Sequence, residues 1–430
     1  MVETNKQMTV PSIRPAKTRI NPPRDRQKSI EHLASSRSKS VMSVAATSFL
    51  PFHCASIGED EIRAVVEVLQ SGWLTTGPRV REFEEKFGRY IGASHSLAVN
   101  SCTGALHLAL AAIRISEGDE VIVPTMTFAA SGEVVLYFKA RPVLVDCKEE
   151  SYQVGPEQIE RAISSRTRAI LPVHYSGYPC DMDPILDIAR KYNLKVIEDA
   201  AHALPSRYKG RTVGTLGDIT CFSFYATKTL TTGEGGMATT ENPEYAERMR
   251  ILSLHGITRN AWMRYSAEGS WRYGILEAGY KYNLTDLQAA LGLAQLVKCD
   301  ALRARRVSIA DRYNRAFAGS DAFGIPSVPE NVEHAWHLYV LRVQASVLRI
   351  DRDRVIEELK QRGIGTSVHF IPLHLHPLYQ NEFGYRGGQF PNAEERFNEA
   401  ISLPIYPSMT PDDVDRVIGA LHDVASRYRR

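Results

Sequence analysis

One lysine lies in a sequence context that could make it a nucleophile. Lys228 follows the strand-like run Cys221-Phe-Ser-Phe-Tyr225 and precedes the glycine-dense turn Thr231-Thr-Gly-Glu-Gly-Gly236. A lysine held on a loop behind aromatic side chains is partly desolvated, which lowers the pKa of its amine and frees it for nucleophilic attack. Such a lysine can form a Schiff base with an aldehyde cofactor. The alternative is an ordinary surface lysine, as most lysines are.

Two adjacent carboxylates end an apolar run in Val196-Ile-Glu-Asp-Ala-Ala-His202. A carboxylate buried at the end of a strand requires a cationic partner. A protonated pyridine nitrogen would serve, and Asp199 would then keep such a ring an electron sink. His202 could reach the same cofactor. The alternative is that Asp199 caps a following helix and His202 packs in the core.

Two further motifs follow expected strands. The run Asn100-Ser-Cys-Thr-Gly104 precedes an apolar helix, where backbone N–H groups and a hydroxyl could bind a phosphate; a plain N-cap at Thr103 is the alternative. The run Pro124-Thr-Met-Thr-Phe128 ends in an aromatic residue that could stack on a flat ring or pack in the core.

Alternating elements position each of these motifs at the end of a strand. Strand-like runs at 96–100, 120–123, 142–146, 168–173 and 195–197 alternate with helical runs at 59–70, 105–113, 129–138, 156–163 and 184–191. This alternation predicts an α/β fold with a mostly parallel sheet covered by helices, and ligands beyond the carboxyl ends of its strands.

After about residue 285 the pattern changes. Leu287 to Tyr313 has the pattern of one long amphipathic helix, followed by a strand near 338–343 and helices near 355–361 and 412–428. We therefore predict a large α/β domain over 48–290 and a smaller C-terminal α+β domain over 291–430, with residues 1–47 as a separate tail.

Composition narrows the class of protein. Of 430 residues 43% are hydrophobic, the net charge is +3, and no apolar run approaches the roughly 18 residues needed to cross a bilayer. We therefore expect neither a membrane nor a nucleic-acid partner.

Residues 1–47 carry nine basic and three acidic residues without apolar periodicity, which predicts a disordered basic tail. The six cysteines lack a C-x-x-C pair, which favours free thiols in a reducing cytoplasm.

Taken together, the motifs resemble the DegT/DnrJ/StrS family of pyridoxal-phosphate (PLP) sugar aminotransferases from about Leu50 to the C-terminus. Five motifs follow one another in the order that is typical of this family. They are the candidate phosphate turn at Asn100–Gly104, the aromatic residue Phe128, the Glu198–His202 run, the Phe222–Lys228 run and the Gly233–Gly236 turn. The implied fold is PLP-dependent transferase fold type I, as in aspartate aminotransferase. Gly279-Tyr-Lys-Tyr-Asn-Leu-Thr-Asp286 and His334-Ala-Trp-His337 most resemble transaminases that make UDP-4-amino-4-deoxy-L-arabinose.

The resemblance implies a role for each matching residue. Lys228 would carry PLP as a Schiff base and move the proton, Asp199 would hold the pyridine nitrogen, and His202 would neighbour the 3-oxygen. The other implied contacts are Phe128 on the ring; Thr103, Gly104, Ser223 and Lys281 at the phosphate; and Tyr225 and His374 on the substrate side. Relatives usually carry Ala or Ser at the position of Gly104, Asn at that of Lys281 and Arg at that of Asn283. We expect no metal, because His374 and His376 lack a third ligand.

The resemblance also implies the reaction: amino transfer from L-glutamate to a nucleotide-linked 4-keto sugar, either a UDP-4-keto-pentose or a 4-keto-6-deoxyhexose. The product would serve polysaccharide, lipid A or secondary-metabolite synthesis. The enzyme would be a cytoplasmic homodimer with its active site at the subunit interface. Three alternatives remain open: an aminotransferase for a keto-inositol, a non-catalytic regulatory protein, and a sugar 3-dehydratase, which would carry His in place of Lys228.

Overall fold

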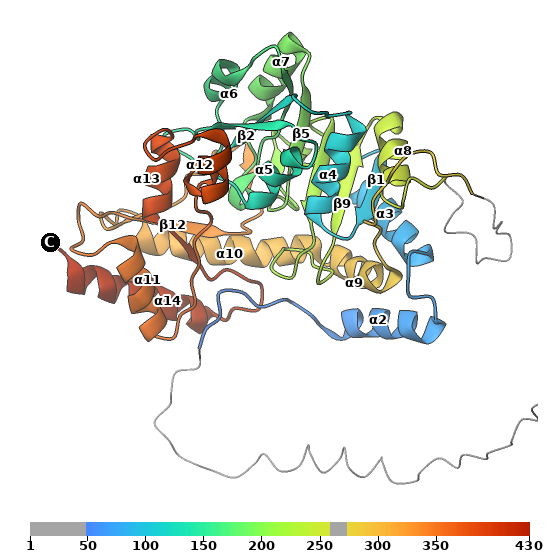
Figure 1. Ribbon diagram of the computed structural model, residues 1–430. Helices are drawn as coiled ribbons and strands as arrows, with labels where there is room; N and C mark the ends of the chain where they lie inside the picture. The colour runs from blue at the N-terminus through green and yellow to red at the C-terminus, as the bar shows by residue number, and fades with distance from the viewer. Residues whose placement is uncertain (1–48, 259–272) are drawn as a thin grey trace, which may run out of the picture. The chain divides into compact units, whose positions relative to one another are not determined.

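The computed structural model describes residues 49–258 and 273–430, so the predicted tail lies outside the described residues. A seven-stranded sheet with the order β1-β9-β8-β5-β4-β2-β3 dominates the first part of the chain (Figure 1). Only β9 is antiparallel to its neighbours in this sheet, which confirms the predicted mostly parallel arrangement. The strands are β1 (His95–Val99), β2 (Glu120–Pro124), β3 (Arg141–Val145), β4 (Thr167–Ile170), β5 (Lys195–Asp199), β8 (Ile219–Ser223) and β9 (Gly236–Thr240).

Helices cover both faces of this sheet. One face packs against α4 (Cys102–Ala112), α5 (Ala129–Leu136) and α8 (Pro243–Leu252). The other packs against α3 (Pro78–Ile91), α6 (Pro156–Ala162) and α7 (Met182–Tyr192). Successive strand residues point to opposite faces, so Val196 lies in the core under α3 and α7 while Ile197 lies in the core under α4. The same alternation separates the two carboxylates that follow them.

The first described helix leaves three of its apolar residues exposed. The predicted helix at 59–70 is α2 (Glu59–Ser71), and Gly72 ends it with a φ of 73°, in the left-handed region that glycine favours. Its apolar residues Ile62, Val66 and Leu69 are nevertheless exposed in this chain. The buried face instead carries Glu61, which forms an ion pair with Lys298.

The C-terminal part builds a second layer around a three-stranded sheet with the order β10-β12-β13. The predicted single helix over 287–313 is wrong at Lys298, where the backbone turns between α9 (Asp286–Val297) and α10 (Cys299–Phe317). The pairing of Lys298 with Glu61 accompanies that break. The remaining elements are β10 (Phe323–Gly324), β12 (Tyr339–Val343), α11 (Arg352–Gln361), α12 (Pro377–Phe383), α13 (Pro391–Glu399), β13 (Ala400–Leu403) and α14 (Pro411–Tyr428).

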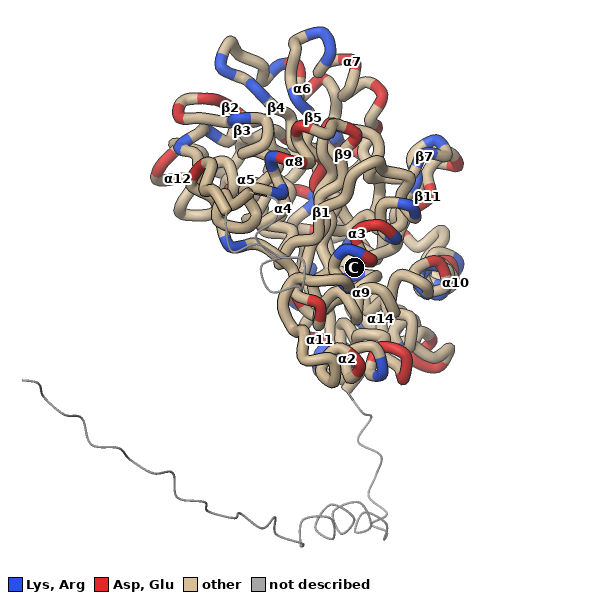
Figure 2. The backbone as a smooth tube through the Cα atoms, turned by 90° about the vertical axis from the view of Figure 1, so that its right-hand side faces the viewer, with Lys and Arg blue, Asp and Glu red and all other residues tan. Residues whose placement is uncertain are grey.

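Short elements complete the described chain. A small sheet with the order β11-β6-β7 joins β6 (Arg207–Tyr208) and β7 (Arg211–Thr212) to β11 (Val332–Glu333). Basic and acidic positions are interspersed over the described helices (Figure 2). The six cysteines are free thiols, and none of the described helices is both long and apolar enough to span a bilayer.

Candidate active site

The carboxylate of Asp199 lies at the carboxyl end of β5, on the face covered by α4 and α5. Its Oδ2 accepts a hydrogen bond from Ser131 Oγ at 2.7 Å, and its Oδ1 accepts one from the backbone N–H of Ala201 at 3.0 Å. Thr127 Oγ1 lies 2.7 Å from Ser131 Oγ and extends the chain of hydroxyls. The residues after Asp199 form turns, so the alternative of a helix cap is wrong. The carboxylate is buried and fixed in direction.

The amine of Lys228 belongs to the turn between β8 and β9. The backbone N–H of Lys228 donates to the carbonyl of Tyr225 at 2.9 Å, which closes the turn. Burial lowers the pKa of Lys228 to about 8, against the opposing effects of Cys102 and Asp199; the Arg306 guanidinium adds a smaller lowering effect. Lys228 and Asp199 are therefore electrostatic neighbours. An amine with this pKa is partly neutral near physiological pH, as a nucleophile or base requires.

A group of histidines shares this electrostatic environment. The rings of His202 and His337 lie 4.4 Å apart, and Phe370 stacks on His202 at 5.8 Å. His202 Nδ1 accepts a hydrogen bond from the backbone N–H of Ser176 at 3.2 Å. Burial first, and the Lys228 charge second, hold the pKa of His202 and of His337 well below the ordinary value. Neutral rings add no further positive charge beside Lys228.

The start of α4 faces the same end of the sheet. The N-cap is Ser101 and not Thr103: Ser101 Oγ accepts from the backbone N–H of Gly104 at 3.0 Å, and Thr103 lies inside the first turn. A Cβ at Gly104 would lie 3.1 Å from Asn100 Oδ1, which leaves little room for a larger residue. Ser223, at the end of β8, is buried and accepts from the backbone N–H of Tyr225 at 3.4 Å. The phosphate contacts of Thr103, Gly104 and Ser223 remain predictions.

Two aromatic side chains of the predicted site are exposed. Phe128 is 59% exposed at the N-terminus of α5, and its ring lies 5.6 Å from that of Phe370. Tyr225 is 48% exposed in the turn that carries Lys228. Exposed aromatic faces of this kind are available for stacking, so both assignments remain compatible with the geometry.

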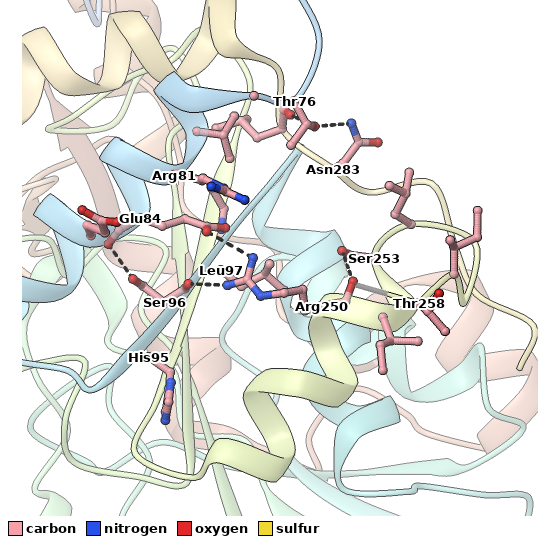
Figure 3. A pocket seen from close by; sticks show the side chains of 18 of the residues that line it. Thr76, Arg81, Glu84, His95, Ser96, Leu97, Arg250, Ser253, Thr258 and Asn283 are labelled. Atoms are coloured by element: carbon pink, nitrogen blue, oxygen red, sulfur yellow. Dashed lines mark hydrogen bonds and ion pairs between the residues drawn. The ribbon is translucent and has the colours of Figure 1, made fainter. Parts of the chain in front are cut away.

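Lys281 lies in an extended segment that runs along the end of β1. The carbonyl of Lys281 accepts from Asn100 Nδ2 at 3.3 Å, and the Lys281 ammonium donates to Asn283 Oδ1. Asn283 Nδ2 in turn donates to Thr76 Oγ1 at 2.7 Å, at the rim of a cavity of about 660 Å³ (Figure 3). Inside that cavity Arg250 pairs with Glu84 at 3.2 Å. The contact between Lys281 and a cofactor phosphate remains a prediction.

Both ring nitrogens of His374 lie within hydrogen-bond distance of other side chains. The residue is fully buried, with Nδ1 2.8 Å from Thr125 Oγ1 and Nε2 3.0 Å from Glu394 Oε1. Both ring nitrogens are thus occupied by protein groups, and a substrate contact remains a prediction that would require one of these bonds to open. Within residues 49–258 and 273–430, His, Cys, Asp and Glu side chains form no group of three or more that could hold a metal.

The residues assembled here fit PLP. They supply an amine of lowered pKa and a fixed carboxylate at the same end of the sheet. They also supply the first turn of α4, where Gly104 and Gly236 leave little room for larger side chains. A Cβ on Gly236 would lie 2.6 Å from the backbone of Ser101, so the two segments approach as closely as their chains allow. Pyridine nitrogen, aldehyde and phosphate thus have counterparts in Asp199, Lys228 and the first turn of α4.

Sequence reasoning missed several neighbours of this site. Ser131 lies three residues after Phe128, and its serine side chain in the first turn of an apolar helix was the available signal. Arg306 is buried on α10, donates to three backbone carbonyls and has its pKa lowered by burial to about 10. His53 bonds to the carbonyl of Ala226 at 3.0 Å, from a segment with no recognisable motif.

Comparison with known proteins shows that the chain is similar to one family of aminotransferases. The model of the DegT/DnrJ/EryC1/StrS aminotransferase family matches residues 55–422. The uncharacterized protein MJ1066 of Methanocaldococcus jannaschii is 55% identical over 89% of this chain and 99% of its own. The spore coat polysaccharide biosynthesis protein SpsC of Bacillus subtilis is 50% identical over 87% of this chain and 97% of its own. Spr1654 of Streptococcus pneumoniae, provisionally named a sugar aminotransferase and solved in PMP and PLP forms, superposes with a TM-score of 0.83 at 37% identity; the match to its PMP form covers 88% of this chain and 99% of that one.

Proposed function

The chain belongs to the DegT/DnrJ/EryC1/StrS aminotransferase family, and from this premise we propose that it aminates a nucleotide-linked 4-keto sugar. Membership makes it a PLP-dependent aminotransferase of fold type I, and the non-catalytic alternative falls away. The observation that carries the proposal is a lysine of lowered pKa that lies within electrostatic reach of the fixed carboxylate of Asp199 at one end of the sheet.

The proposed substrate is a UDP-4-keto-pentose or a 4-keto-6-deoxyhexose nucleotide, with L-glutamate as the amino donor. Support comes from SpsC, which is named for polysaccharide biosynthesis, and from the sugar aminotransferase name of Spr1654. The segments Gly279–Asp286 and His334–His337 favour the 4-keto class through their resemblance to arabinose-type enzymes. The product would enter polysaccharide, lipid A or secondary-metabolite synthesis.

Each site residue has a separate proposed role in the reaction. When bound, PLP supplies the aldehyde that takes up an amino group and the ring that spreads negative charge. Lys228 would attach the cofactor, and its Nζ would then act as the acid and base that moves a proton during amino transfer. Asp199, held by Ser131 and Ala201, would pair with the protonated ring nitrogen. His202 would neighbour the ring oxygen, and Phe128 would stack on the ring.

We propose a cytoplasmic homodimer as the working form. The exposed apolar residues Ile62, Val66 and Leu69 line one side of α2, and Val297 at the end of α9 is 85% exposed. Apolar stripes of this kind mark protein interfaces. In this dimer Lys281 would contact the partner's cofactor phosphate, so that each site would use both subunits.

Two measurements test the proposal. The PLP-loaded enzyme is incubated with glutamate and a panel of UDP- and GDP-linked 4-keto sugars plus a keto-inositol, and products are identified by mass spectrometry. We expect amination of a nucleotide 4-keto sugar. Amination of the keto-inositol alone would replace the substrate class, and activity with none of the sugars would refute it.

Borohydride reduction tests the lysine. Reduction of the holoenzyme should leave the cofactor on the peptide that contains Lys228. The Lys228→Ala variant should lose this label and at least about 1,000-fold of its rate, the order that a positioned proton-transfer group contributes. Equal labelling of Lys228→Ala would assign the attachment to another residue.

A further inference from the structure

A second, smaller cavity lies away from the predicted cofactor residues. Its volume is about 80 Å³, and Lys228 and Asp199 do not line it. One wall follows β3 and β4 and includes Gln153 and Tyr178; the opposite wall comes from the C-terminal part and includes Arg342 of β12. The cavity therefore joins the two parts of the fold at the carboxyl end of the parallel sheet, where such folds bind ligands.

Several buried polar atoms at this cavity have no hydrogen-bond partner among the described residues. They are Tyr152 Oη, Gln153 Oε1 and Arg396 Nε, and all three residues line the cavity. Gln153 is 4% exposed and Arg396 is 7% exposed. Buried polar groups are almost always paired, so three unpaired ones around one hollow require ordered water or a ligand that pairs them.

The unpaired atoms are held in fixed directions. Gln153 Nε2 donates to the carbonyls of Tyr175 and Tyr178 at 3.3 and 3.1 Å, which sets the position of Oε1. Arg396 donates to the carbonyl of Glu149 and thereby anchors its guanidinium. Tyr152 stacks on Tyr175 with ring centroids 4.6 Å apart. The cavity is thus pre-formed, which lowers the entropy cost of binding.

The charges at the cavity favour an anion. Arg342 and Arg396 both lie near Glu399, at 3.6 and 3.5 Å, and these separations are longer than good hydrogen bonds. Two guanidinium groups against one carboxylate leave one net positive charge, shared between the buried Arg396 and the partly exposed Arg342. Glu150 also lines the cavity but is exposed, so water screens its charge.

We propose that this junction cavity binds a hydrogen phosphate ion. Arg396, Arg342 and Tyr152 Oη donate to phosphate oxygens, and Gln153 Oε1 accepts a hydrogen bond from the P–OH group that hydrogen phosphate retains near neutral pH. A carboxylate has no such proton to give. The volume corresponds to about two or three waters, which suits a free ion better than a phosphate ester. The bound ion bridges the two walls and stabilises their contact.

Phosphate binding to the PLP-loaded enzyme tests this assignment, because the cofactor then occupies its own phosphate contacts. Titration calorimetry should detect one site for inorganic phosphate, and the melting temperature should rise with phosphate concentration. Sulfate, which has no proton near neutral pH, should bind about tenfold more weakly. Acetate and glycerol phosphate should bind less tightly than phosphate; tighter binding of glycerol phosphate would point to an ester as the ligand and overturn the free-ion assignment.

A conservative variant separates binding from folding. Tyr152→Phe removes a hydroxyl that has no hydrogen-bond partner among the described residues, so the stability without phosphate should hold while phosphate affinity falls about tenfold. Arg342→Gln, on the partly exposed side, should lower the affinity at least as much. Tyr192→Phe, which removes an exposed hydroxyl bonded to Glu160, should leave the affinity unchanged. No calorimetric site, or equal affinity in wild type and Tyr152→Phe, would overturn the proposal.

Discussion

Glu198 and Asp199 are consecutive carboxylates at the end of β5, but they meet opposite faces of the sheet. Glu198 Oε2 pairs with His174 Nε2 at 2.8 Å, while its Oε1 accepts from Thr220 Oγ1 at 2.7 Å and from Gly217 N–H at 2.6 Å. Asp199 accepts from Ser131 and from Ala201 N–H. One carboxylate is satisfied by the fold, and the other retains acceptor capacity toward Lys228.

The difference teaches what distinguishes a functional carboxylate from a structural one at the same strand end. Burial alone would raise the pKa of Glu198, but hydrogen bonds from His174, Thr220 and Gly217 outweigh it and hold that pKa below its ordinary value. Glu198 therefore stays charged without any ligand and ties β5 to β8 and to the segment after β4. Asp199 instead has the Lys228 amine as an electrostatic neighbour, and its oxygens can accept further hydrogen bonds.

Replacing Asp199 should give the largest effect on kcat. Asp199→Asn cannot pair with a protonated ring nitrogen, and the loss of a buried charge partner corresponds to about 4 kcal/mol, or about 1,000-fold in kcat. Urea unfolding should change by only about 1 kcal/mol, because the amide still accepts from Ser131. Steady-state kinetics and unfolding of the same preparation measure both. A variant of normal kcat would remove Asp199 from the mechanism.

Replacing the satisfied carboxylate should give the opposite pattern. Glu198→Gln leaves His174 without its anionic partner inside the core and should lower the free energy of unfolding by about 3 kcal/mol. The kcat of the folded fraction should stay within about threefold of wild type, because Glu198 meets the opposite face of the sheet from Asp199. A threefold change in kcat corresponds to less than about 1 kcal/mol. Denaturant titration at pH 7 checks the first expectation. Loss of activity at unchanged stability would contradict the contrast between the two residues.

The pH dependence of cofactor uptake sharpens the comparison. Only the neutral amine attacks the aldehyde, so the rate of PLP uptake by apoenzyme should rise with a midpoint near pH 8 and fall about tenfold per unit below it. The anionic Asp199 favours the protonated amine and raises the pKa of Lys228. Asp199→Asn should therefore move the midpoint to lower pH, while Glu198→Gln should leave it in place. A wild-type midpoint near 10.5, the ordinary value for lysine, would refute the effect of burial.

The sequence predicted the motifs of this site better than their partners. Alternation along β5 places Glu198 and Asp199 on different faces, but the rule that a buried carboxylate needs a cation applies equally to both. His174 as the partner of Glu198 comes from another strand end, 24 residues away, and no local pattern connects them. The residues at the end of this strand suggested Asp199 as the partner of a protonated ring nitrogen, and the family resemblance assigned it the same role. The environment that separates Asp199 from Glu198 depends on tertiary contacts.

The fold was predictable where periodicity is strong. The alternation up to β5 follows from short apolar runs between turn residues, and β12, α11 and α14 lie where their patterns predict. The break between α9 and α10 has no proline or glycine to signal it; it coincides with Lys298 turning to a buried Glu61. The apolar residues on one side of α2 repeat at helical spacing, but within residues 49–258 and 273–430 they remain exposed.

The smallest expected effect concerns the hydroxyl that holds Asp199. Ser131→Ala removes the 2.7 Å hydrogen bond to Oδ2, and the loss of about 1 kcal/mol of orientation should lower kcat about fivefold with little change in KM. Thr127→Val removes the next hydroxyl in the chain, which touches Ser131 and not Asp199, and should have the weaker effect. Steady-state kinetics at saturating PLP compare the two variants. An equal loss in both would mean that the hydroxyl chain acts through packing, whereas a loss confined to Ser131→Ala assigns the effect to the direction of the Asp199 carboxylate.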